Sequence, residues 1–236
     1  MTIDNANFFC YYGNTSPRLV ARSREVFCAK ISLMTTPTTL RRIVLVDGEN
    51  LRFALERLLA TLGSSTIEQD IENFNYRGMI EEMLSDNLPT SIMWFGAKLS
   101  IYRQTPDLQK KTTDLISKQA IFVNKLQQQG IYFNKTGRLI ARETKPCKNC
   151  RHTSWTLSEK GVDVGLAVKV MTEAQIPNTE IVVISADTDL LPAFRKAKKL
   201  GTKIMHIGYE YRTINALVDV ADTSRVISLP LVQNHK

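Results

Sequence analysis

From residue 41 onward the chain alternates short apolar runs with longer segments whose apolar residues recur at helical spacing. Runs such as "RRIVLV" and "VVIS" are typical of strands buried on both faces, because a parallel sheet covered by helices produces continuous apolar runs. The pattern predicts strands at 41–46, 91–99, 131–134, 138–143, 181–185, 203–208 and 225–229, and helices at 51–62, 76–84, 107–129, 161–174, 189–200 and 213–221.

Strands separated by helices in this way predict an α/β fold with a mostly parallel central sheet and helices on both faces. Residues 1–40 differ, since they mix Asn, Thr, Ser and Pro with scattered aromatic residues and show no sustained period. "MTTPTTL" at 34–40 reads as an extended linker. We therefore expect an N-terminal extension over 1–40 and one domain over 41–236.

Composition narrows the class of protein. A chain of 236 residues that is 43% hydrophobic can bury a sizeable core. It has no apolar stretch of about 18 residues, so no membrane span is expected. The N-terminus lacks the features of a secretory signal, and four scattered cysteines suit a reducing compartment, so we expect a cytoplasmic protein. The net charge of +8 favours a polyanionic partner such as nucleic acid.

Three acidic signals fall at predicted strand ends or helix starts. Asp47 follows the first strand in "LVDGEN", Asp163 lies in the first turn of the helix in "EKGVDVGLAVKVM", and Asp187 and Asp189 end the run "VVISADTDLL". Ligands of such sheets bind beyond the carboxyl ends of the strands. Carboxylates converging there would repel one another unless a hard cation neutralised them, which predicts Mg²⁺ or Mn²⁺.

Each acidic signal also has a purely structural interpretation. Asn50 and Asp189 are preferred helix N-caps, worth about 0.5–2 kcal/mol, and Pro192 fits the first turn of the helix after Asp189. Asp163 could simply favour its helix dipole. Capping does not, however, require Asp47, Asp163 and Asp187 to meet.

The motifs "VDGEN", "KGVDVGLA" and "VVISADTDLLPAF", in this order, resemble the NYN branch of the PIN-like nuclease superfamily, and LabA-like proteins in particular. The resemblance covers about residues 41–228. It implies a three-layer α/β/α fold and a metal-dependent endoribonuclease that hydrolyses phosphodiester bonds in single-stranded RNA. The residues it implies as catalytic and metal-binding are Asp47, Asp163, Asp187 and Asp189, supported by Asn50. Ser185 and Thr188 could tune hydrogen bonds at this site, although strand-end structure is the favoured use of both.

Two positions depart from the family pattern. Ser-Ala-Asp stands at 185–187 where relatives often have Ser-Gly-Asp, which is a mild change. Lys169 stands where many relatives carry another Asp. This lysine weakens the case for a second metal ion more than for the first.

A basic stretch leads into the Asp163 motif and is opposed only by Glu143 and Glu159. We expect it to form the positive rim of the acidic crevice and to bind RNA phosphates, although a solvated charged loop is the plain alternative. Its members are Lys135, Arg138, Arg142, Lys145, Lys148, Arg151 and Lys160. The second cluster, Arg195, Lys196, Lys198 and Lys199, reads as a solvated helix face.

"CKNCRH" offers Cys147, Cys150 and His152 as part of a zinc site, but zinc normally takes four ligands and no fourth is evident. The nearby aromatic residues could stack on unpaired bases, with core packing the favoured use of at least two of them. They are Tyr132, Phe133 and Trp155.

Two other enzyme classes fit the sequence less well than a nuclease. A D-x-D phosphatase normally begins with its motif, whereas only 47 residues follow Asp189, and a nucleotidyltransferase would need a Gly-Ser helix start that is missing. The serious alternative is a catalytically inactive PIN-like module that binds RNA or acts as a scaffold. The sequence leaves the oligomeric state open, and a homo-oligomer is compatible with it.

Overall fold

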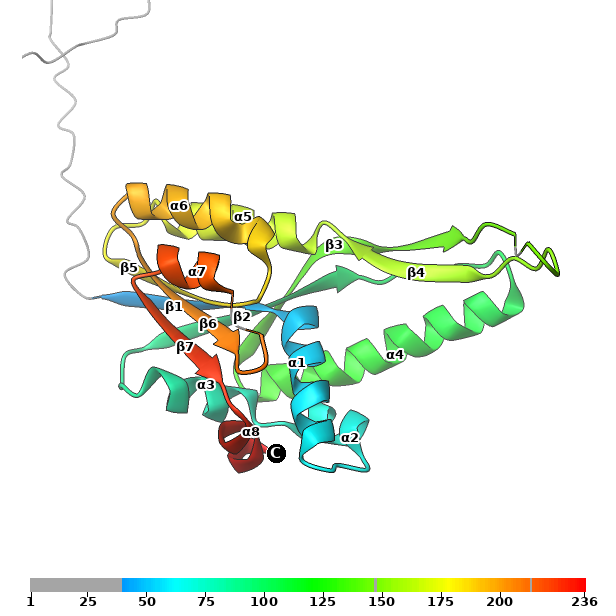
Figure 1. Ribbon diagram of the computed structural model, residues 1–236, viewed down its shortest axis with the longest axis horizontal. Coiled ribbons are helices and arrows are strands. Elements are labelled where there is room, and N and C mark those ends of the chain that lie inside the picture. Colours follow the sequence, from blue (N-terminus) through cyan, green and yellow to red (C-terminus); the bar gives the residue numbers. More distant parts are fainter. Residues whose placement is uncertain (1–39, 147, 213) are drawn as a thin grey trace, which may run out of the picture. The chain divides into compact units, whose positions relative to one another are not determined.

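The computed structural model describes residues 40–146, 148–212 and 214–236. Its centre is a seven-stranded sheet with strand order β4-β3-β2-β1-β5-β6-β7 (Figure 1). Every neighbouring pair is parallel except β3 and β4, which are antiparallel. The strands are β1 (Arg41–Asp47), β2 (Thr90–Lys98), β3 (Ile131–Glu143), β4 (Trp155–Lys160), β5 (Thr179–Ile184), β6 (Lys203–Tyr209) and β7 (Thr223–Ile227).

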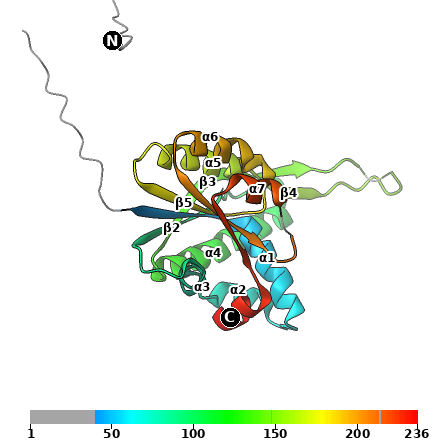
Figure 2. The same ribbon diagram turned by 60° about the vertical axis from the view of Figure 1, so that its left-hand side comes forward.

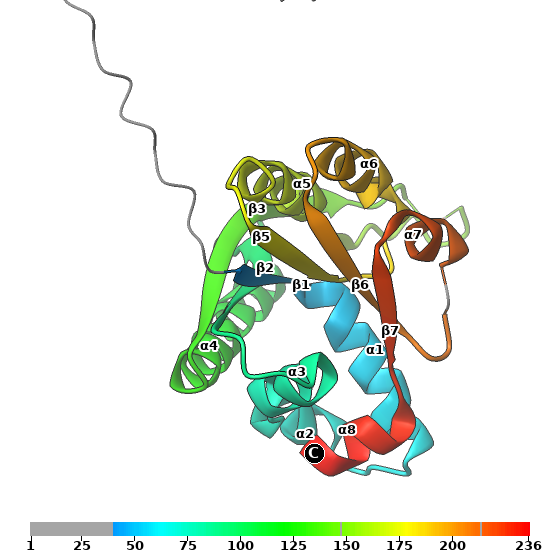
Figure 3. The same ribbon diagram turned by 90° about the vertical axis from the view of Figure 1, so that its left-hand side faces the viewer.

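Helices cover both faces of this sheet (Figures 1 and 3). Both faces of β1 are apolar and need covering, because Val44 and Val46 pack in one hydrophobic core while Ile43 and Leu45 pack in the other. One layer contains α1 (Gly48–Thr61), α2 (Ile67–Asn73), α3 (Tyr76–Leu84), α4 (Pro106–Gln128) and α8 (Leu229–His235), and the other contains α5 (Val162–Glu173), α6 (Leu191–Lys199) and α7 (Asn215–Val220). The predicted three-layer α/β fold is confirmed.

The prediction was wrong around residues 131–160. Two strands were expected before a cysteine-containing loop, but β3 runs without a break and pairs with β4, which was not predicted. Gly137 does not end the strand because its positive φ of 69° lets the chain pass close to the backbone of Lys160 and Val162. The β3–β4 hairpin projects beyond the body of the domain (Figures 1 and 2).

Two short helices were also missed. α2 has the polar sequence IEQDIEN and buries only Ile71, and α8 is seven residues long. Such elements are stabilised by packing onto the domain rather than by their own periodicity. Residues 1–39 of the predicted extension lie outside the described residues. Within the described residues, no helix is both long and apolar enough to cross a membrane.

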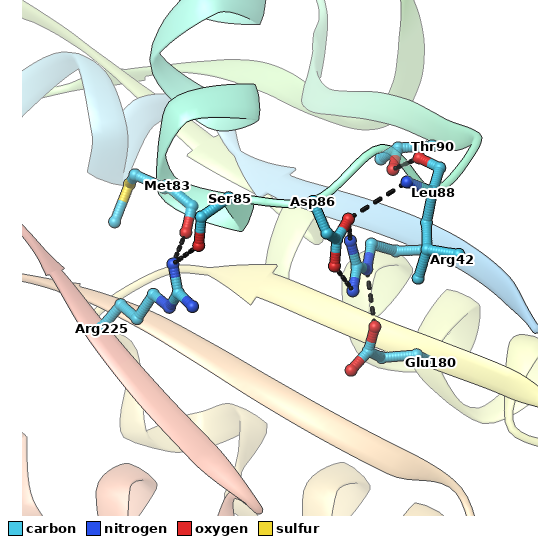
Figure 4. Close-up of polar contacts among 8 residues, drawn as sticks. All are labelled: Arg42, Met83, Ser85, Asp86, Leu88, Thr90, Glu180 and Arg225. Atoms are coloured by element: carbon cyan, nitrogen blue, oxygen red, sulfur yellow. Dashed lines mark hydrogen bonds and ion pairs between the residues drawn. The ribbon is translucent and has the colours of Figure 1, made fainter.

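The amino-terminal edge of the sheet is held by a buried arginine (Figure 4). Arg42 is 4% exposed, and its guanidinium donates to Glu180 at 2.6 Å and to both oxygens of Asp86 at 2.5 and 2.8 Å. Nearby, Arg225 of β7 donates to the Met83 carbonyl and, at 2.9 Å, to Ser85 Oγ. These contacts tie the loop after α3 to the strands, at the opposite edge from the predicted acidic site.

Candidate active site

The site lies where the order of the strands reverses. The chain proceeds from β1 through β2 to β3 on one side and then places β5, β6 and β7 on the other side of β1. This is the topological switch point at which ligands bind in open α/β sheets. Val46 pairs with Ile184 in parallel register, so the residues that follow, Asp47 and Ser185, come side by side at the carboxyl edge.

Asp47 is fixed by three hydrogen bonds although its side chain is almost fully buried. It accepts from the Asn50 backbone N–H at 3.2 Å, from Asn50 Nδ2 at 2.9 Å and from Ser185 Oγ at 2.8 Å. Desolvation raises the pKa of Asp47 to about 6, and the charge of Asp163 adds to the effect, while the bonds from Ser185 and Asn50 oppose it. Asp47, not Asn50, caps α1, so that part of the sequence interpretation was wrong.

Ser185 joins Asp47 to two other parts of the site. Its hydroxyl accepts from the Asp187 backbone N–H at 3.0 Å, and its carbonyl lies 2.8 Å from His206 Nε2. Since a carbonyl can only accept, Nε2 carries the proton and Nδ1 faces Ser224 Oγ at 3.2 Å. Burial lowers the pKa of His206, so the neutral imidazole positions Ser185. No motif or spacing in the chain indicates this role of His206.

Asp187 and Asp189 differ in their surroundings. Asp187 is half-buried and accepts from the Asp189 backbone N–H at 2.9 Å, which caps the short 3-10 helix η1 (Thr188–Leu190). Asp189 is exposed, and α6 begins after Leu190 without a side-chain cap. The expected capping by Asp189 was therefore wrong, although Pro192 does lie in the first turn of α6.

Asp163 lies in the first turn of α5, as expected. Gly161 directly precedes the helix, and its positive φ of 84° turns the chain from β4 into α5. Partial burial is the largest cause that raises the pKa of Asp163. The negative charges of Asp187, Asp189 and Glu49 raise it further. These carboxylates thus act on one another electrostatically.

A cavity of about 490 Å³ is lined by Asp47, Asp163 and Asp187. Two acids that the sequence interpretation missed, Glu49 and Glu159, line it as well. Burial raises the pKa of Glu159 to about 7, helped by the charge of Glu49 and by a hydrogen bond with it. Asp189 and Thr188 do not line the cavity, although the charge of Asp189 still reaches Asp163.

The remaining wall of this cavity is aromatic and basic. It is formed by Phe53 and Arg57 from α1 and by Tyr211 and Arg212 from the turn after β6. None of these four side chains was predicted, because the sequence does not show that this turn meets α1. The cavity therefore has an acidic half and a half that offers apolar rings and positive charge.

The predicted basic rim is built on the β3–β4 hairpin instead of a loop. Arg138 pairs with Lys160 and Arg142 with Thr156, so these three basic residues share one face of the hairpin, whereas Glu159 lies on the other. Lys145, Lys148 and Arg151 are exposed near its tip, and Lys135 lines a separate hollow with Lys98. Among the described residues, none of the seven lines the acidic cavity.

The remaining predicted features contribute less. Cys147 lies outside the described residues, while Cys150 and His152 are exposed, and no described group of three or more His, Cys, Asp or Glu residues is arranged to hold a metal ion. Phe133 packs in the core, but Tyr132 is 61% exposed. Lys169 forms an ion pair with Glu173 at 2.6 Å.

Comparisons with known proteins agree with the fold. A solved structure of a protein of unknown function from Vibrio parahaemolyticus superimposes with a TM-score of 0.51 and 18% identity, covering 83% of this chain and 97% of that one. An uncharacterized protein from Methanocaldococcus jannaschii is 40% identical over 67 residues, which span 28% of each chain. The family model of the NYN domain matches residues 41–229. The chain therefore belongs to the NYN domain family, which has a PIN-like, nuclease-type fold.

Proposed function

We propose that the protein is a metal-dependent endoribonuclease that hydrolyses phosphodiester bonds in single-stranded RNA. The observation that carries the proposal is the convergence of five carboxylates on one cavity at the topological switch point. A fold needs no such convergence, and it costs free energy through desolvation and repulsion. Membership of the NYN domain family supports the same reaction class.

The donor set fits a hard divalent cation. Carboxylate oxygens are the ligands of Mg²⁺ and Mn²⁺. Burial raises the pKa values of Asp47 and Glu159, and a bound cation would favour their charged forms. Mg²⁺ is usually bound through one or two carboxylates with several waters, so a close group of three is not required. Asp47 and Asp187 would hold the ion, with Asp163 bonding its waters and Asp189, outside the cavity, adding negative charge. Such an ion polarises a phosphate and lowers the pKa of bound water.

The residues around the acids set their geometry. Ser185 and Asn50 hold both oxygens of Asp47, and His206 holds the backbone of Ser185. Rigid positioning of this kind maintains a reactive arrangement without reorganisation during the reaction. Asp163 lines the same cavity from the first turn of α5, where it would orient a nucleophilic water.

A catalytically inactive RNA-binding module is the second candidate. It is favoured by the lack, within the described residues, of three acids arranged to hold an ion directly, and by Lys169 being paired with Glu173. Cleavage of a labelled single strand with Mg²⁺, with Mn²⁺ and with EDTA separates the two functions. Binding without cleavage under every condition would support the inactive module.

The acidic cavity also predicts how stability depends on pH. The folded-state pKa of Asp47 is raised from 3.8 to about 6, so its contribution to stability is full below pH 3.8 and is lost as pH rises through about 6. In EDTA, wild type should therefore lose about 1–3 kcal/mol relative to Asp47→Asn as pH rises from about 4 to 7. Urea unfolding of both proteins measures this difference.

Comparing the two proteins removes the contribution of other acids. Asp86 and Asp222, whose pKa values are lowered, lose ion pairs in acid equally in both. Saturating Mg²⁺ should reduce the difference. Parallel pH profiles in EDTA would show that folding does not raise the pKa of Asp47.

The hairpin predicts a salt-dependent effect. Arg138 and Arg142 share one face of the hairpin, and changing both to Glu should weaken single-stranded RNA binding. The slope of log affinity against log salt should become shallower by the amount expected for the loss of about two phosphate contacts. Fluorescence anisotropy over a range of salt concentrations measures the slope. The matched control reverses Arg195 and Lys199 of α6, and an equal effect of both pairs would indicate nonspecific charge.

A further inference from the structure

We propose that Phe53, Arg57 and Tyr211 form a binding subsite for one unpaired nucleotide directly beside the acidic cluster. The proposal rests on the nuclease function above and identifies how the substrate strand is held there. The base would stack on the aromatic and guanidinium surfaces, and the adjoining phosphate would then reach the carboxylate half of the same cavity.

The first argument is the spacing along α1. Glu49, Phe53 and Arg57 all line the cavity and are four residues apart, so they form one ridge on the helix surface. At a rise of about 1.5 Å per residue, the ridge extends about 12 Å, from an acid beside the active carboxylates, through a ring, to a cation. A nucleotide offers matching chemistry, because it joins a planar base to an anionic phosphate.

The second argument is exposure. Phe53 is 51% exposed and Tyr211 is 38% exposed, whereas Leu51, Leu55 and Leu58 of the same helix are almost completely buried. The core is therefore filled without Phe53. The Arg52 guanidinium lies 5.6 Å from the centroid of the Phe53 ring, and the exposed half of the side chain is open to a ligand in the cavity. Stacking on an aromatic side chain contributes substantially to single-strand binding and tolerates any base.

The third argument is the way Arg57 is held. Its guanidinium lies over the ring of Tyr211, 4.4 Å from the centroid, and Tyr211 lies nearly parallel to the buried Tyr209 with ring centroids 6.0 Å apart. Arg57 makes no ion pair within the described residues, whereas Arg52 on the same helix pairs with Glu56 at 3.1 Å. A positioned, unpaired guanidinium keeps its donors for phosphate and its outer face for a base.

Binding is tested in an Asp187→Asn background, so that the strand is not cleaved, with a fluorescein-labelled single-stranded RNA and Mg²⁺. Phe53→Ala and Arg57→Ala should each weaken binding about 5- to 100-fold. Arg195→Ala on α6 is the control, since it removes the same charge from an exposed helix position that does not line the cavity, and should change affinity less than about 2-fold. Phe53→Tyr should retain binding, because it keeps a ring for stacking.

A scan with one abasic residue at successive positions shows whether the side chain contacts a base. One position should weaken binding to the protein with Phe53, and the same position should cost nothing further in Phe53→Ala. Equal effects of Arg57→Ala and Arg195→Ala, or additive losses in the abasic scan, would overturn the subsite while leaving the nuclease function in place. A wild-type protein that neither binds nor cleaves RNA would overturn the proposed function itself.

Discussion

Asp187→Asn is expected to abolish Mg²⁺-dependent cleavage of single-stranded RNA while the protein stays folded. Asp187 lines the acidic cavity, and its charge contributes to the raised pKa of Asp163. The side-chain oxygen of Asn can still accept from the Asp189 backbone N–H, so η1 keeps its cap. Because one repulsive charge is removed, the metal-free variant should melt at the same temperature as wild type or higher.

Asp189→Ala is the matched control for this experiment. Its exposed carboxylate neither lines the cavity nor caps α6, so its removal should change stability by less than about 0.5 kcal/mol. Activity should fall less than in Asp187→Asn, because Asp189 acts on the site only through its charge on Asp163. Cleavage assays with Mg²⁺ or Mn²⁺ and thermal melts in EDTA provide both readouts. Full activity of Asp187→Asn would end the nuclease assignment, and equal destabilisation by both changes would favour a structural role.

The sequence predicted those parts of the acidic site whose positions depend only on the register of neighbouring parallel strands. Apolar runs that end in "VD" and "ISAD" had to be neighbouring parallel strands for Asp47 and Ser185 to meet, and they are. It did not predict which side chain caps which helix. Asn50 and Asp189 are preferred cap residues by type and were also predicted to belong to the site, but Asp47 and Asp187 make the capping bonds. Capping depends on local φ and ψ angles that the sequence alone does not fix.

The rest of the cavity could not be predicted because it depends on contacts between distant segments. Glu159 reaches the cavity only because β4 pairs with β3, and that hairpin has the weak, half-exposed pattern of an edge. Tyr211 reaches it because the turn after β6 brings its ring under Arg57 of α1. Polar or aromatic residues in short turns carry no periodic signal, so their partners appear only in three dimensions.

The largest effect on stability is expected from Arg42→Met, at the opposite edge of the sheet (Figure 4). Arg42 is 4% exposed and is the partner of Glu180, whose side chain is 13% exposed, so removing it leaves a poorly hydrated carboxylate without a counter-charge. Removing one member of a buried ion pair costs about 3–5 kcal/mol. By contrast, Arg52→Ala breaks an exposed pair with Glu56 and should cost less than about 1 kcal/mol.

Urea unfolding with a common slope measures both variants, and a second change tests the cause. If the loss comes from the unpaired charge of Glu180, the double variant Arg42→Met with Glu180→Met should recover much of it, because well-packed apolar replacements of a buried pair are often neutral or stabilising. A cost of Arg42→Met below about 1 kcal/mol would instead mean that Glu180 regains water when Arg42 is removed. Arg42 lies five residues before Asp47 on β1, about 16 Å along the strand. The folded fraction of Arg42→Met should therefore cleave RNA at the wild-type rate, which separates the stability of the fold from the chemistry of the acidic cavity.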